Sequence, residues 1–414
     1  MNNQSYDEAR MLADQAHGPL APFIRDYHAA VVEKGYIGRG VYVKIYRAAD
    51  FDRWLHREQI PVSAIDDQCV ERYHARDSGT RRVSSVNERP AMRSLLAFLR
   101  AKAAIAALPS VSAYPAIDAS IDDFRQHLHH ARGLTVGTID NYWGYARDFL
   151  IERFGGAPVD LGAIAATDVI AHVQQQATRL SPGSVKLITT ALRAFLRYLQ
   201  YLGKVDPELI AAIPAVAHWA TTPPIPRAIS PEDARQLLAH CSGRTPREIR
   251  DRAILLLLAR LGLRSGDIVN MTLDDVDWEN GSLRMRGKGR RECFMPLPPD
   301  VGEAIAIYLR DARPHCDDRR LFLRARAPFR GFNRTDCIGS VVKNTLAHAG
   351  IDAPRKGAHQ FRHALAVRLL GKGASLPEIG EVLRHRSPQA TAIYARVDID
   401  ALRDLVVAWP GEAA

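Results

Sequence analysis

The chain has 414 residues, of which 47% are hydrophobic and 25% are charged, and its formal net charge is +10. This length leaves room for two or three domains with a sizeable core, and the composition excludes a disordered or membrane-embedded chain. The excess of lysine and arginine favours a polyanionic partner, most simply nucleic acid, although a basic enzyme without such a partner would carry the same charge.

The cysteines and the first residues indicate where the protein works. The cysteines are odd in number, scattered and without the CxxC spacing of metal or redox motifs, so we expect reduced thiols in a cytoplasmic protein. No apolar run reaches the length of a membrane span, and the polar residues 1–5 do not resemble a signal peptide. We therefore expect no membrane partner.

The order of periodic segments and linkers predicts the domain organisation. Helical spacing of apolar residues fills most of the first half, and two proline-rich stretches interrupt it. In chain order we expect a loose N-terminal arm, a helical domain, a second helical domain, a linker and a last domain, at residues 1–18, 19–110, 116–205, 206–227 and 228–414.

The two helical domains resemble each other in sequence. Asp50-Phe51 corresponds to Asp148-Phe149, Pro61 to Pro158, and the Leu-x-Ala-Phe-Leu-Arg run ending at Arg100 to the one ending at Arg197. A repeat of about one hundred residues indicates domain duplication and not a solenoid. The alternative is that helical bundles share generic leucine and phenylalanine patterns.

The last domain is predicted to be helical with a small sheet. Ser230-Pro231 is typical of a helix start, and Asn280-Gly281 of a tight turn. We expect a three-stranded antiparallel sheet ending near Leu297, with Lys288 between two glycines at a hairpin tip. Helices should follow at residues 302–313, 334–349, 360–370, 376–384 and 398–409. The expected fold class is therefore mainly α with a small antiparallel β-sheet (α+β).

A group of reactive side chains lies in the last domain. His359 and Arg362 are three residues apart and share a helix face, and His385 and Tyr394 follow. Upstream, Arg264 begins a helix just after an apolar one. Arginine binds two phosphate oxygens with its planar fork, histidine relays protons, and tyrosine can act as a nucleophile. Together these groups could hold a phosphate and attack it.

Each of these residues also has an ordinary structural explanation. Arg264 could form a surface ion pair, and Lys288 could belong to a generic basic turn in which Arg290 competes for its role. His385 alone would more often be a buried structural histidine, and Tyr394 alone a core residue.

The four-residue spacing of His359 and His363 raises the possibility of zinc. Residue 360 is Gln, however, where a metalloprotease helix needs Glu. We therefore expect no metal.

Taken in order, the reactive residues resemble those of the tyrosine recombinase (phage integrase) family, over about residues 115–410. The matching residues are Arg264, Lys288, His359, Arg362, His385 and Tyr394. The resemblance implies a site-specific DNA recombinase or integrase, of the kind found in mobile elements, that cuts and rejoins strands through a 3′-phosphotyrosyl intermediate without a cofactor.

The resemblance also implies a role for each residue. Tyr394 would attack the scissile phosphate, Arg264 and Arg362 would neutralise the transition state, and His385 would add a hydrogen bond. Lys288 would protonate the leaving 5′-oxygen, and His359 would assist proton transfer from the tyrosine.

The second helical domain resembles the core-binding domain of the same family, in residues 132–142 and 180–193. There the resemblance directs Ser184, Lys186, Thr190 and Arg193 toward DNA phosphates, although a solvated helix face would look the same. Arg290 and Arg386 are further candidates for DNA contact. The first helical domain could bind flanking DNA or a protein partner.

One motif departs from the family pattern. The usual Leu-Gly-His-Ser/Thr reads Leu383-Arg384-His385-Arg386, so a flexible glycine is replaced and two positive charges are added. We interpret the two arginines as extra phosphate contacts.

The resemblance finally implies partners and alternatives. The expected partner is double-stranded DNA, bound by a homo-tetramer on a synapse of two sites, with accessory or sister recombinases and a nucleoid location. The last helix would either cover its own core or dock on a neighbouring protomer. The alternatives are a type IB topoisomerase-like or dimer-resolving enzyme, or a catalytically silent DNA-binding partner of another recombinase.

Overall fold

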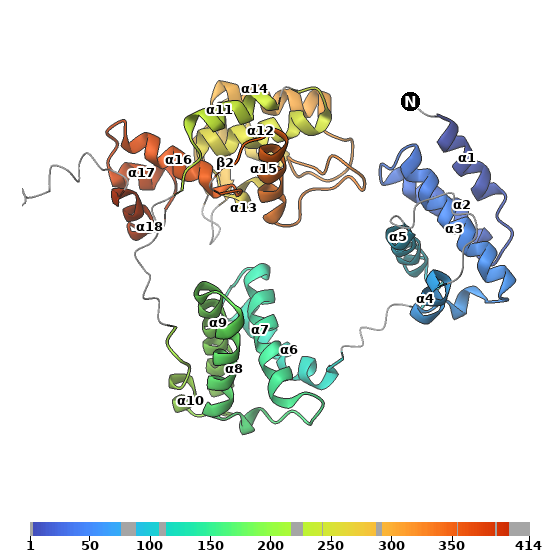
Figure 1. Cartoon of the computed structure of the whole chain (residues 1–414), viewed down its shortest axis with the longest axis horizontal. Coiled ribbons are helices and arrows are strands. Elements are labelled where there is room, and N and C mark those ends of the chain that lie inside the picture. The colour runs from blue at the N-terminus through green and yellow to red at the C-terminus, as the bar shows by residue number, and fades with distance from the viewer. Residues whose placement is uncertain are drawn as a thin grey trace, which may run out of the picture. The chain divides into compact units, whose positions relative to one another are not determined.

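The computed structural model describes eight stretches of the chain and divides into two compact units. The described residues are 3–75, 88–106, 113–216, 227–241, 243–286, 292–353, 355–385 and 387–396. One unit is Leu108–Thr222, and the other comprises Met1–Ala107 and Pro223–Ala414. Figure 1 labels the helices of each part. Within the described residues, no helix is both long and apolar enough to cross a membrane.

The first helices form a bundle with its own apolar core. They are α1 (Asn3–Asp14), α2 (Ala21–Glu33), α3 (Arg39–Arg57), the 3₁₀ turn η1 (Val62–Ala64), α4 (Asp67–Ala75) and α5 (Glu88–Ala101). The prediction of a loose arm at residues 1–18 is wrong, because Ala9 and Ala13 of α1 are buried in this core. The small side chains of these alanines let α1 approach α3 closely.

The second unit is also helical. It contains α6 (Pro115–His130), α7 (Val136–Phe154), η3 (Leu161–Ala163), α8 (Ala166–Arg179), α9 (Pro182–Tyr201) and α10 (Pro207–Ala211). As predicted, Ser181 caps α9, and its hydroxyl accepts a hydrogen bond from the N–H of Ser184 at 3.4 Å. The prediction that the linker begins at residue 206 is wrong, because Leu209 and Ile213 are buried against this core.

The two bundles share a helix order, in which α2 to α5 correspond to α6 to α9, and they share buried positions. Leu95, Phe98 and Leu99 of α5 recur as Leu192, Phe195 and Leu196 of α9, and all six are buried. An aromatic contact recurs as well: Tyr27–Phe98 has ring centroids 5.3 Å apart, and the corresponding pair Phe124–Phe195 has them 5.2 Å apart. These recurrences favour the duplication, since generic leucine patterns would not reproduce a specific ring contact.

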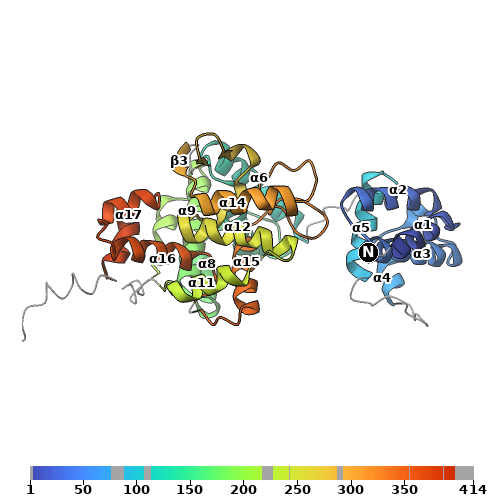
Figure 2. The same cartoon turned by 90° about the horizontal axis from the view of Figure 1, so that it is seen from above.

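The last part of the chain is built around α12. It contains α11 (Pro231–His240), α12 (Pro246–Leu261), α13 (Ser265–Asn270), η4 (Leu273–Asp275), α14 (Pro299–Ile307), a π-helical turn η5 (Tyr308–Ala312) and α15 (Asp336–His348). All residues of α12 from Ala253 to Leu258 are buried, which makes it a central helix with neighbours on every side (Figure 2). Gly262 ends α12 in the left-handed conformation, with φ of 58°.

The predicted sheet is confirmed. Its strands β1 (Val276–Asp277), β2 (Ser282–Arg286) and β3 (Glu292–Pro296) are antiparallel in the order β1-β2-β3. Lys288 and Arg290 lie between β2 and β3, outside the described residues.

The final elements form a small separate core beside α12. They are α16 (His359–Leu370), α17 (Leu376–Val382), α18 (Gln389–Ala392) and the 3₁₀ turn η6 (Ile393–Arg396). Leu365, Ile379, Leu383 and Tyr394 are buried together there. Ser375 caps α17, and its N–H and hydroxyl donate to Glu378. Residue 386 and the helix expected at residues 398–409 lie outside the described residues.

Candidate active site

Arg362 ties three segments of the last domain together. It lies in the first turn of α16 and is 4% exposed. Its Nη1 donates to the carbonyl of Gly262 at 2.7 Å, and its Nη2 donates to the carbonyl of Leu383. Burial, and then the nearby charge of Arg264, lower the pKa of Arg362 to about 10, so its guanidinium stays charged at neutral pH.

Arg264 and Asp267 connect the start of α13 to the end of α17. Arg264 caps α13, and its Nη2 donates to the carbonyl of Arg384 at 2.9 Å. Asp267 accepts from the N–H of Arg264 at 3.0 Å and from the guanidinium of Arg384 at 2.5 Å. Asp267 therefore fixes the position of the Arg384 guanidinium.

The backbone of Arg384 explains why glycine is common at its position. Its φ is 53°, in the left-handed region that a side chain disfavours by roughly 1–2 kcal/mol. Its ion pair with Asp267 offsets part of this cost. The interpretation of Arg384 as a phosphate contact is wrong for this structure, because its guanidinium binds Asp267 and its side chain is 16% exposed.

Tyr394 is buried with its hydroxyl against a histidine. It is 1% exposed, and its Oη lies 3.0 Å from Nδ1 of His363. Burial raises the pKa of Tyr394, and the positive charge of Arg362 partly opposes that rise. The ring of His385 stacks nearly parallel to the phenol, with centroids 6.4 Å apart.

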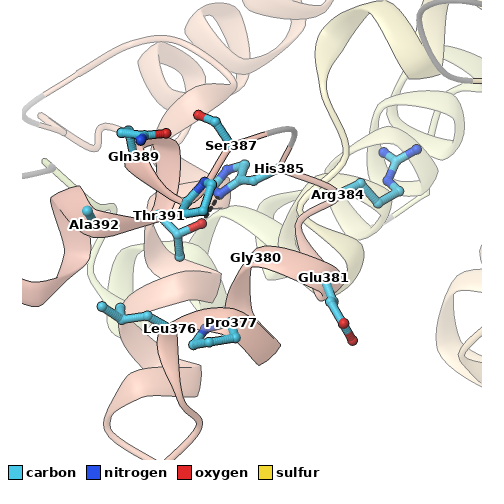
Figure 3. Close-up of a pocket in the computed structure, with 11 residues that line it drawn as sticks. Leu376, Pro377, Gly380, Glu381, Arg384, His385, Ser387, Gln389, Thr391 and Ala392 are labelled. Atoms are coloured by element: carbon cyan, nitrogen blue, oxygen red, sulfur yellow. Dashed lines mark hydrogen bonds between the residues drawn. The ribbon is translucent and has the colours of Figure 1, made fainter.

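His385 is oriented by the segment that carries Tyr394. Its Nδ1 lies 2.6 Å from Oγ1 of Thr391, a contact drawn in Figure 3. A cavity of about 550 Å³ opens beside this pair, between the start of α17 and α18. Burial lowers the pKa of His385 to about 4, with further lowering by the charges of Arg362 and Arg264. The imidazole is therefore neutral at pH 7.

His359 and His363 occupy successive turns of α16. Their ring centroids are 6.1 Å apart. His359 reaches the surface, yet partial burial of its ring and the charges of Arg362 and Arg264 lower its pKa. Burial, His359 and the nearby arginines likewise lower the pKa of His363. Three neutral histidines and two cationic arginines thus lie in one site with a phenol, an arrangement suited to phosphate binding and proton transfer.

Comparison with known proteins identifies the family. Residues 227–400 match the phage integrase family. A Sinorhizobium fredii protein named as an integrase/recombinase, y4rA, is 46% identical over 404 residues, which is 97% of each chain. The chain belongs to the phage integrase family. It is a site-specific tyrosine recombinase or integrase, an enzyme that binds DNA and acts in its recombination and integration.

More distant relatives agree with this assignment. The tyrosine recombinase XerD of Listeria monocytogenes (strain EGD-e) is 29% identical over 297 residues, covering 69% of this chain and 96% of XerD. The solved structure of the XerH recombinase bound to a difH substrate covers 79% of this chain and 90% of its own, with a TM-score of 0.54 and 19% identity. A lambda integrase dimer bound to a core site covers 67% and 94%, with a TM-score of 0.50 and 18% identity. At these identities, the solved structures show the shared fold.

The recombinase brings five of the six predicted catalytic residues into one place. These are Arg264, His359, Arg362, His385 and Tyr394. The sixth, Lys288, lies outside the described residues, as do Arg290 and Arg386. Two site residues were missed by sequence reasoning: His363 and Thr391. The spacing of His363 from His359 was noticed only as a metal pattern, whereas no local signal marks Thr391.

The predicted DNA-binding residues of α9 do not form a single group. Lys186 and Thr190 are exposed one turn apart, and the hydroxyl of Thr190 donates to the carbonyl of Lys186 at 2.7 Å. Arg193 is on the same side but donates to the carbonyls of Ile213 and Pro214, at 3.4 and 3.5 Å. Ser184 lies on another side of the helix, and its hydroxyl contacts that of Ser181 at 3.1 Å.

The three depressed histidine pKa values predict acid sensitivity. His385 binds a proton below about pH 6.5 in the unfolded chain but only near pH 4 in the folded protein. The free energy of unfolding is therefore highest above pH 6.5 and falls progressively as the pH is lowered toward 4. The loss should be on the order of 1–2 kcal/mol after allowance for solvent screening of partly exposed rings. Urea unfolding at a series of pH values measures it. His385→Asn should weaken the pH dependence of the free energy of unfolding. A pH dependence as steep as that of the wild type would contradict this explanation.

Proposed function

We propose that Tyr394 is the nucleophile of strand cleavage. Its Oη would form a bond to the scissile phosphorus while the bond to the 5′-oxygen breaks, leaving a 3′-phosphotyrosyl link and a free 5′-hydroxyl. The phenolic proton passes to a neutral histidine, and Lys288 supplies a proton to the leaving 5′-oxygen. Attack of another strand's 5′-hydroxyl reverses these bonds and completes recombination.

The observation that carries the proposal is the hydrogen bond between His363 and Tyr394 beside Arg362. The phenol and His363 Nδ1 are 3.0 Å apart, which is the distance required for direct proton transfer. The unprotonated His363 can accept this proton, because its lowered pKa keeps it neutral at pH 7. Arg362 and Arg264 supply the positive charge that a pentacoordinate phosphorane requires. We therefore add His363 to the residues proposed for catalysis.

Cleavage requires the tyrosine to leave its buried position. A phenol that is 1% exposed cannot reach a DNA phosphate, and burial keeps its pKa high. The segment that holds it is short, because α18 and η6 each have four residues. A DNA phosphate between Arg264 and Arg362 would accept a hydrogen bond from the phenol and so favour a position of the tyrosine beside the two guanidinium groups.

The domain roles and the assembly are also proposed. We assign residues 116–205 to the core-binding domain, with Lys186 and Thr190 of α9 as phosphate contacts, and residues 228–414 to the catalytic domain. Relatives have been crystallised bound to DNA, one as a dimer on a core site. Double-stranded DNA bound by a homo-tetramer on two sites, in the nucleoid of the cytoplasm, is the corresponding proposal here.

Covalent trapping tests the proposal. DNA bound by the recombinase in cells is sequenced to define its site, and duplexes nicked beside each candidate scissile phosphate are then incubated with the purified protein. The wild type should yield a protein–DNA adduct that survives denaturing gels, and Tyr394→Phe should yield none. Mass spectrometry of the adduct identifies the linked residue.

A buried tyrosine of the same domain provides the matched control. The hydroxyl of Tyr308 accepts a hydrogen bond from the N–H of Leu323 at 3.0 Å. Tyr308→Phe should therefore lose some stability but keep the adduct. An adduct in Tyr394→Phe, or attachment to another residue, would end the proposal.

A further inference from the structure

A second concentration of arginine lies at the far end of α12 from the active site. The chain leaves the core after Leu323 and returns at Gly331, where the two residues form a β-bridge. A cavity of about 520 Å³ lies between this loop, the start of α12 and one face of α15. Its lining includes Arg247, Arg250, Arg324, Arg326 and Arg330. We call this cavity the arginine cleft.

Two of the five arginines contact a carboxylate, and it is the same one. Asp251 accepts from Nε and Nη2 of Arg250 at 2.9 and 2.6 Å and lies 3.4 Å from Nε of Arg247. The three loop arginines have no carboxylate partner among the residues that the structure describes, and none of the lining residues is acidic. Guanidinium groups gathered in this way repel one another unless an anion lies between them.

We propose that the arginine cleft binds backbone phosphates of the DNA duplex flanking the cleavage site. Its polar lining beyond the arginines consists of Asn333, Ser340 and Asn344, side chains that contact phosphates and fix register. The lining residues of α15 recur at helical spacing from Cys337 to Asn344, so the cleft follows that helix for about 10 Å. About three phosphates of one strand occupy this length at 3.4 Å each.

The chemistry favours a duplex backbone over a nucleotide or a single strand. Binding of a base normally uses an open aromatic face. Phe332, the aromatic residue of the cleft, is 8% exposed, and the guanidinium of Arg250 lies 5.1 Å from its ring centroid. Among the residues that the structure describes, no other aromatic side chain lines the cleft.

The place of the cleft defines which DNA it would bind. Arg247 and Leu261 lie at opposite ends of α12, so the cleft is separated from the active site by about 20 Å. A duplex lying along this path covers the distance in about six base pairs. The inference rests on the proposed function only in taking duplex DNA as the substrate.

Salt dependence of DNA binding tests the cleft. The full-length triple variant Arg324→Ala, Arg326→Ala, Arg330→Ala is titrated with a labelled duplex of about 40 base pairs at several salt concentrations. If each arginine neutralises a phosphate, the slope of log K against log salt should fall by about 2–3, and affinity by roughly tenfold or more. Replacement of the same residues by lysine should restore most of the slope, because lysine keeps the charge.

An equally charged variant elsewhere provides the control. Arg235, Arg310 and Arg319 are exposed arginines that are each paired with a carboxylate. Their triple alanine variant removes the same charge and should leave the slope nearly unchanged. The proposal would be overturned if the slope of log K against log salt were unchanged in the cleft variant. It would also be overturned if the control variant lost as much of the slope as the cleft variant. Because binding is measured without cleavage, this result is independent of whether Tyr394 forms the covalent link.

Discussion

Arg362→Lys should lower the single-turnover rate of strand cleavage by roughly 10³-fold. The guanidinium donates to the carbonyls of Gly262 and Leu383 and must also bind a phosphate oxygen. It therefore uses several N–H donors that lie in one plane. Lysine presents a point charge without this fork and cannot serve all three partners. Cleavage of a nicked substrate at saturating protein measures the chemical step.

Folding must be separated from chemistry in this experiment. Loss of the guanidinium leaves two carbonyls near the buried site without their partner, at a cost of about 1–3 kcal/mol each where they stay unpaired. Thermal unfolding of Arg362→Lys and rates at a temperature well below its Tm remove that effect. Arg368→Lys, on an exposed position of the same helix, is the matched control and should cleave at the wild-type rate. Cleavage by Arg362→Lys within a few-fold of wild type would refute the assigned role.

His363→Phe should slow cleavage by roughly 10²-fold, because the phenol loses the nearest group that can accept its proton. A phenylalanine ring fills a similar volume next to Tyr394 but cannot form the hydrogen bond. The wild-type rate should be flat above about pH 6.5, where His363 is neutral, and should fall at lower pH as His363 becomes protonated. The variant should instead gain about tenfold per pH unit up to the pKa of the phenol. Single-turnover rates at a series of pH values distinguish these two profiles.

The pH profile also separates proton transfer from mere support of the tyrosine. If His363 only packed against Tyr394, the variant would be slower at every pH by one constant factor. His348→Phe, at an exposed histidine near the end of α15, controls for the replacement of an imidazole by a phenyl ring away from the site. Parallel profiles for His363→Phe and the wild type would exclude the base role.

Sequence reasoning predicted much of the fold because its signals are local. The start of α11 follows from Ser230-Pro231, and the turn before β2 follows from Asn280-Gly281. The errors came where packing overrides local character. α1 looks polar in isolation, and only its contact with α3 shows that Ala9 and Ala13 are core residues.

The reactive groups of this recombinase, and their order along the chain, could be recognised from residue types and short spacings together with the resemblance to the family. Their partners could not. Asp267 binds Arg384 across 117 residues of sequence, and His363 meets Tyr394 across 31. Such distances depend on how α12, α16 and α17 pack around a shared core, and no rule of helix period or capping extends over so many residues. The same packing buries Tyr394, and it lowers the pKa values of His363 and His385 so that both are neutral at pH 7.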